Sequence, residues 1–292
     1  MTRRRYVLKV LAAAVALGLP ISSPTTDEAE LSLDECRQRA AKFLGVTAGE
    51  LAPRTAGSGA KRTSDLHPTT YTFILPYPKD AQVEQWQREV GRVSIVVEAR
   101  WGRVTGVTYQ RRRYEIGTRE LTEADAKRIA AAYLKAHWPY WPDGRFYSAT
   151  KPSRPGAAAR PVPAATQSFH WVVEQDQIRL GQGSVHVNLT TGKAISYSQH
   201  YCSAEGLSPA RVTKQQAINA ALSKLDKQQR AKAKVEEAYL ATGWYKGRVR
   251  LVWVVWVKAP ARMPPSFRGT PPIRTHGLQL DAHTGQVYME VR

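Results

Sequence analysis

The chain has 292 residues, 42% of them hydrophobic, and a formal net charge of +19. This is the composition of a globular protein, long enough for two or three small domains with their own cores. Its two cysteines, Cys36 and Cys202, exclude a disulfide framework, although they could form one bridge or stay as two buried thiols.

The first 26 residues have the pattern of a signal peptide. Four basic residues accompany an apolar run from Val10 to Leu19. Such a run is too short to span a bilayer core, which needs roughly 20 apolar residues. We therefore predict a signal peptide over residues 1–26, export to the bacterial cell envelope or beyond, and no transmembrane span after its removal. An uncleaved N-terminal anchor is the alternative.

Three later segments begin alike and predict helices with one apolar face. They read "LSLDECRQRAAKFLG", "LTEADAKRIAAAYLKAHW" and "VTKQQAINAALSKL", with the caps Ser32, Thr122 and Thr213. Three residues after each cap, a polar side chain can reach back to the cap amide: Glu35, Asp125 and Gln216. The caps are 90 and 91 residues apart, which indicates a repeated unit.

Strand-like runs follow each helix. Residues 71–75, 169–173 and 249–257 are rich in β-branched and aromatic residues, which favour pleated, half-buried surfaces. In the third unit, "VEEAYLATG" predicts an additional strand before them.

A hairpin with a central glycine closes each unit. Gly102, Gly192 and Gly285 are 90 and 93 residues apart, and an acid or amide lies four residues before each of them: Glu98, Asn188 and Asp281. We interpret the glycines as structural turns, because glycine readily adopts a positive φ and Asp or Asn can accept hydrogen bonds from turn amides. The alternative for the last hairpin is a metal ion between Asp281 and His283, but the residues equivalent to His283 are an arginine and a threonine.

Together these patterns predict an α+β fold of three repeated units, each with one helix packed on a 3–4 stranded antiparallel sheet. The unit boundaries are 31–115, 116–206 and 207–292. The last unit, with "VTKQQAINAAL", "GRVRLVWVVWV" and "LQLDAHTGQVY", resembles the PepSY domain and related repeats of bacterial envelope proteins. In that family an early helix precedes a meander that ends in a "vDa.tGkV" hairpin. The resemblance implies association with extracellular peptidases or wall hydrolases as an inhibitor, chaperone or positioning module.

No catalytic motif accompanies this pattern. The sequence has no HExxH, GxSxG, P-loop or helix-opening GxGxxG motif. His170, His186 and His200 fall in or beside strands, but they lack the paired spacing of metal ligands. We therefore expect no catalytic residues, no metal site and no cofactor, and we expect that the protein is not an enzyme.

The positive charge is concentrated at the C-terminal end. Residues 207–292 carry 15 basic and 5 acidic side chains, against a net +5 for residues 31–115 and +3 for residues 116–206. The leading hypothesis is a non-enzymatic exported protein that binds an envelope protein such as a peptidase or wall hydrolase. The alternative is an envelope protein that binds an anionic polymer through a basic surface on the third unit. That surface would comprise Lys224, Lys227, Arg230, Lys232, Lys234, Lys246, Arg248 and Arg250. Nucleic acid is not an expected partner, because export removes the chain from most nucleic acid.

Overall fold

The computed structural model describes residues 30–54, 61–64, 67–79, 81–82, 91–118, 120–140, 143–153, 164–261 and 271–291. The predicted signal peptide, residues 1–26, lies outside these ranges. Within them the helices are α2 (Leu33–Leu44), α4 (Glu123–His137), α5 (Lys214–Ser223) and α6 (Lys227–Ala231), with the short 3-10 helices η1 (Ala48–Glu50) and η2 (Arg111–Arg113). None of the helices in the described ranges is long and apolar enough to cross a membrane.

The described strands are distributed from residue 52 to residue 291. In order they are β1 (Ala52–Pro53), β2 (Lys61–Ser64), β3 (His67–Leu75), β4 (Val93–Glu98), β5 (Arg103–Tyr109), β6 (Gly144–Ala149), β7 (Thr166–Gln175), β8 (Ile178–Asn188), β9 (Ala194–Tyr201), β10 (Lys234–Tyr245), β11 (Arg248–Pro260), β12 (Ile273–Asp281) and β13 (Val287–Val291).

The three predicted helix starts are confirmed. Ser32, Thr122 and Thr213 are the N-caps of α2, α4 and α5, and each side chain accepts a hydrogen bond from the backbone N–H three residues later. The capping box is complete in α2 and α5. In α4 the partner is an Asp, which is one methylene shorter than Glu and hydrogen-bonds the cap hydroxyl.

The prediction of three separate helix-on-sheet units is wrong, because the strands of all three segments join one mixed sheet. In the described ranges 13 strands form this sheet, in the order β1-β3-β4-β5-β9-β8-β10-β11-β12-β13, with β2 beside β3 and with β6 and β7 beside β8. Across the first predicted boundary β5 pairs with β9, and across the second β8 pairs with β10 in parallel. An open strand edge presents unpaired N–H and C=O groups, and pairing between segments satisfies them.

The hydrophobic core gives a second reason why the predicted units are not independent. One continuous core lies under both α2 and α4, from Ala40 through Ile95 of β4 to Leu134 and to Tyr197 of β9. A smaller core lies under α5 and includes Ala217, Ala221, Val255 and Leu280. The first two predicted units therefore share their core, whereas the third has its own.

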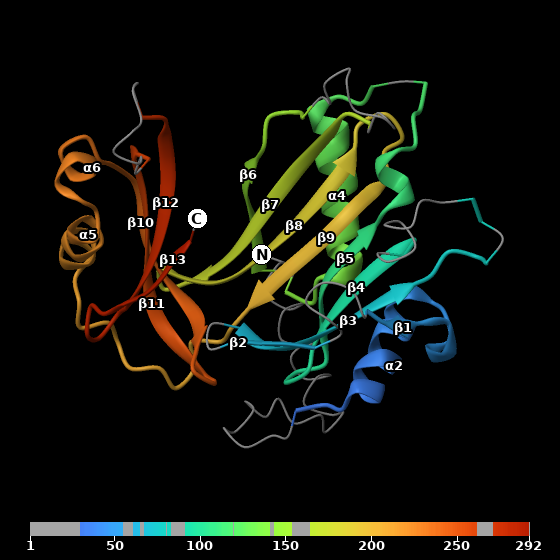
Figure 1. Cartoon of the computed structure of the whole chain (residues 1–292), viewed down its shortest axis with the longest axis horizontal. Helices are drawn as coiled ribbons and strands as arrows, with labels where there is room; N and C mark the ends of the chain where they lie inside the picture. The colour runs from blue at the N-terminus through green and yellow to red at the C-terminus, as the bar shows by residue number, and fades with distance from the viewer. Residues whose placement is uncertain are drawn as a thin grey trace, which may run out of the picture.

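The helices lie on the outer sides of the molecule. In Figure 1, α5 and α6 lie at the left against the strands of the C-terminal part (residues 207–291), and α2 and α4 lie at the right against those of the N-terminal part (residues 30–206). Side chains alternate between the two faces of a strand, so each strand also has a face without a helix. On β9, Tyr197 is buried in the core whereas Ser198 is exposed.

The three turn glycines lie in hairpins and have positive φ. Gly102 (60°), Gly192 (72°) and Gly285 (73°) are in the β4–β5, β8–β9 and β12–β13 turns. The carboxylate of Asp281 accepts hydrogen bonds from the backbone N–H groups of His283 and Thr284, both at 2.8 Å. This side chain therefore stabilises a turn, in the manner expected of Asp at this position.

Candidate functional site

A cleft of about 630 Å³ lies where the helix-free faces of the N-terminal and C-terminal parts meet. We call it the inner cleft. Residues of β3, β4, β5, β8 and β9 form one wall, and residues of β10, β11 and β12 form the other. Its lining includes Thr70, Gln182, Ser198, His200, Tyr239 and Gln279. The lining also includes apolar residues such as Val96 and Val254, and Glu98 and Arg179 are its charged residues, so the cleft differs from the strongly basic chain around it.

Glu98 is the acidic residue of the inner cleft. Its side chain is only 6% exposed, and its Oε1 atom is buried without a hydrogen-bond partner. Desolvation by burial raises the pKa of Glu98 to about 7, although Arg103 and Arg100 act in the opposite direction. This carboxyl therefore changes its charge near neutral pH, inside a cleft.

The spacing of Glu98 matches that of Asn188 and Asp281 and therefore predicts a turn residue, which is not what the structure shows. Asn188 accepts hydrogen bonds from the backbone N–H groups of Thr190 and Thr191, at 2.9 and 3.1 Å. Glu98 lines the inner cleft instead. The signal that could have shown this was the residue type, because Glu is one methylene longer than Asp or Asn.

Arg179 joins the two parts of the molecule beside the inner cleft. It is 9% exposed and donates to Glu237 of β10 (Nη2 to Oε1, 3.0 Å), while its Nε atom lies 3.5 Å from Glu174 of β7. Its guanidinium also lies over the ring of Tyr239, 3.6 Å from the centroid. Two carboxylates and an aromatic face already pair with this cation, so we assign it a structural role.

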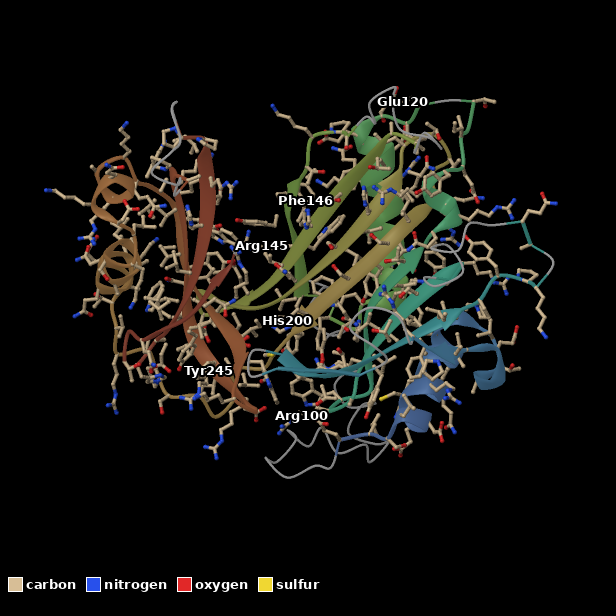
Figure 2. The ribbon with its side chains drawn as sticks, viewed as in Figure 1. Arg100, Glu120, Arg145, Phe146, His200 and Tyr245 are labelled. Atoms are coloured by element: carbon tan, nitrogen blue, oxygen red, sulfur yellow. The ribbon has the colours of Figure 1, made fainter. Side chains whose placement is uncertain are left out.

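Arginine and aromatic side chains hold the parts together at one end of the inner cleft. The guanidinium of Arg103 lies 4.2 Å from the ring centroid of Trp101, which contacts Trp244 of β10 edge-on at 5.8 Å. Arg100 lies over the same Trp244 ring at 5.0 Å and donates to the carbonyl of Gly247 at 3.4 Å. Figure 2 shows Arg100 at the lower end of the molecule, where the two parts approach each other, with His200 nearer the centre.

The eight basic residues proposed for the third unit do not form one surface. All eight are exposed, but Lys224, Lys227, Arg230, Lys232 and Lys234 lie around α5, α6 and the start of β10. Lys246, Arg248 and Arg250 lie at the β10–β11 turn. The 12 residues of β10 separate the groups, which corresponds to roughly 40 Å of strand. Within the second group, Arg250 is already 3.6 Å from the carboxylate of Asp281.

Cys36 and Cys202 are both buried free thiols, so of the two alternatives the structure shows the one without a bridge. Burial raises the pKa of Cys36 to about 11 and that of Cys202 to about 12. A thiol with such a pKa is almost entirely protonated at neutral pH and is a poor nucleophile.

The three strand histidines do not assemble into a metal centre. Burial lowers the pKa of His170 and of His186, which favours the neutral imidazole. The Nε2 atom of His200 lies 3.7 Å from the Sγ atom of Cys202. In the part of the chain that the structure describes, no three His, Cys, Asp or Glu side chains gather as metal ligands would.

Comparison with known proteins gives no family. No family model matches the chain, and no curated protein matches it. Among solved structures it is similar to an uncharacterized protein from Eubacterium rectale, with 10% sequence identity and a TM-score of 0.45, over 88% of this chain and 81% of that one. A likeness at this level carries no argument about function.

Proposed function

We propose that this chain is a non-enzymatic binding protein that holds an extended segment of a partner protein in its inner cleft. The observation that carries the proposal is the chemistry of the cleft. Its volume of about 630 Å³ is in the range of pockets that bind ligands. From the PepSY-like pattern of the sequence, the partner is an exported envelope protein such as a peptidase or wall hydrolase.

The lining of the inner cleft suits a peptide better than a polyanion. Gln182, Gln279 and Ser198 carry both donors and acceptors, which can pair with the N–H and C=O groups of an extended chain. Val96 and Tyr239, both half-buried, add apolar surface for side chains between these polar groups. The one arginine of the lining, Arg179, is already paired with two carboxylates.

A substitution that fills the inner cleft tests the proposal. Ser198 is exposed and lies on the cleft wall, so Ser198→Trp would occupy the space of the partner segment. Ser223→Trp is the matched control, because Ser223 is exposed at the end of α5 on the outer side. We expect binding of an exported peptidase fraction to fall more than tenfold in Ser198→Trp and to stay within twofold in the control. Equal binding by both variants would contradict the proposal.

Salt separates this function from binding of an anionic envelope polymer through the third unit. Polyanion binding would weaken steeply between about 50 mM and about 500 mM salt, because it depends on counterion release and on screened charges. Binding through the mostly neutral inner cleft should change little over the same range. Complete release of every partner at high salt would favour the polymer.

A further inference from the structure

A second cavity lies on the helix-covered side of the sheet and shares one described lining residue, Gln199, with the inner cleft. It has a volume of about 900 Å³ and opens between α2 and α4, above β5 and β9. Four cations line it: Arg39, Lys42, Arg103 and Lys135. No Asp or Glu is among its described lining residues. We call it the cationic cavity.

The sequence brings these cations together from three elements. Arg39 and Lys42 are three residues apart on α2 and therefore share one face of that helix. Lys135 lies in the last turn of α4, and Arg103 begins β5 directly after the Gly102 turn. The set is dispersed over nearly a hundred residues, so no local motif reveals it.

Neighbouring cations on the same helices form ion pairs, whereas Arg103 and Arg39 of the cationic cavity interact with Glu98 and Glu35 without forming ion pairs. Arg37 of α2 pairs with Asp34 at 3.5 Å, and Arg128 of α4 pairs with Asp125 at 3.0 Å. In the described part of the chain no carboxylate forms an ion pair with a cation of the cavity. Glu35, one turn before Arg39, is held by the backbone N–H and hydroxyl of its cap Ser32, at 2.8 and 2.7 Å.

Arg103 is fixed before any ligand binds. Its Nη1 atom donates to the hydroxyl of Tyr140 at 2.8 Å and to the carbonyl of Tyr201 at 3.2 Å, and its guanidinium lies over Trp101. A guanidinium that is already oriented loses little rotamer freedom when it binds an anion. The other three cations are exposed and can therefore adjust to the ligand.

The lining of the cationic cavity adds aromatic surface. Trp138 lines it and is 2% exposed, yet the indole N–H of Trp138 is buried without a hydrogen-bond partner. The rings of Phe43 and His137 also lie there, with centroids 4.8 Å apart. Phe43, His137 and Trp138 therefore give the cavity aromatic surface beside its cations.

We propose that the cationic cavity binds a phosphoryl group of a small ligand. A phosphate monoester carries a charge of about −1.5 to −2 and three acceptor oxygens, which suits several converging cations better than one carboxylate does. An arginine guanidinium can donate hydrogen bonds to two such oxygens at once, and a lysine ammonium group adds a positive charge. This proposal concerns a small anionic ligand rather than a partner segment, so it stands or falls independently of the proposed partner protein.

Binding of pyrophosphate at constant ionic strength, measured by calorimetry, tests the proposal. The variant is Arg39→Gln with Lys42→Gln, and the control is Lys224→Gln with Lys227→Gln. Both variants remove two exposed positive charges from helical segments or their ends. We expect the first variant to weaken pyrophosphate binding at least tenfold and the control to change it less than twofold. No binding by the unaltered protein, or equal weakening in both variants, would overturn the proposal.

Two further probes identify the source of the phosphoryl group. Citrate has a similar charge without phosphorus, and if it binds as tightly as pyrophosphate the site is not specific for phosphoryl groups and the proposal fails. Vesicles of phosphatidylglycerol present the same group in a membrane surface. Retention on these vesicles that is lost in the Arg39→Gln, Lys42→Gln variant and kept in the control would assign a lipid headgroup. Binding of pyrophosphate alone would assign a soluble ligand.

Discussion

Replacing Glu98 by Gln keeps the shape of this buried side chain and removes its charge. Burial raises the pKa of Glu98 from 4.5 to about 7, so between these two values the folded protein keeps a proton that the unfolded chain has lost. The free energy of unfolding of the unaltered protein therefore falls as the pH rises from about 4.5 through about 7, and this contribution is constant above that range. At about 1.4 kcal/mol per pKa unit, the loss amounts to about 3 kcal/mol.

Gln is neutral at every pH, so the free energy of unfolding of the Glu98→Gln variant does not fall in this way as the pH rises. We expect Glu98→Gln to match the unaltered protein at pH 4.5 and to exceed its free energy of unfolding by up to about 3 kcal/mol at pH 8. Urea denaturation across this pH range measures the difference. Asp176→Asn is the control, because Asp176 is exposed in the β7–β8 turn. If the effect of Glu98→Gln is independent of pH, or if the variant is less stable at pH 8, the account of Glu98 as a buried carboxyl that titrates near neutral pH is refuted.

Three further predictions concern the turns and the thiols. Asn188→Ala should lower the free energy of unfolding, measured by urea denaturation, by about 3 kcal/mol. The reason is that this fully buried amide accepts hydrogen bonds from two turn N–H groups and donates to two carbonyls. A decrease below about 1 kcal/mol would contradict this role. Gly192→Ala should lower the melting temperature more than Gly206→Ala does. Both glycines have positive φ, but only at Gly192 would a Cβ atom meet a neighbour, Ile129, at 3.1 Å. Equal decreases in melting temperature would count against that contact. Both cysteines should react slowly with a thiol reagent in the native protein and completely once it is denatured without reductant, whereas fewer than two reactive thiols would show a bridge.

Local signals in the sequence were sufficient for the helix starts and the turns. A cap such as Ser32 and its partner Glu35 are three residues apart, so their interaction depends on little beyond the helix itself. The same holds for Gly285, whose positive φ and preceding Asp281 belong to one short hairpin.

These local signals do not determine which strands pair over long range in the sheet. The pairing of β5 with β9 and of β8 with β10 depends on which strand edges meet in three dimensions, and the period-two pattern of a strand is the same whichever neighbour it has. The sites were missed for the same reason. Glu98 occupies a turn-like position in the sequence but faces a cleft that residues of the C-terminal part complete. The cations of the cationic cavity come from three separate elements.

Site-specific photo-crosslinking tests the binding of a partner segment in the inner cleft most directly. A photoreactive residue replaces Gln182, which is exposed on the cleft wall, or Ser223, which is exposed on the outer side. The partner fraction is added at about 500 mM salt, where contacts between exposed charges are screened, and the adducts are mapped by mass spectrometry. Position 182 should crosslink to one continuous segment of the partner, and position 223 should not. Adducts at position 223 alone, or no adduct at position 182 while the partner remains bound, would contradict it.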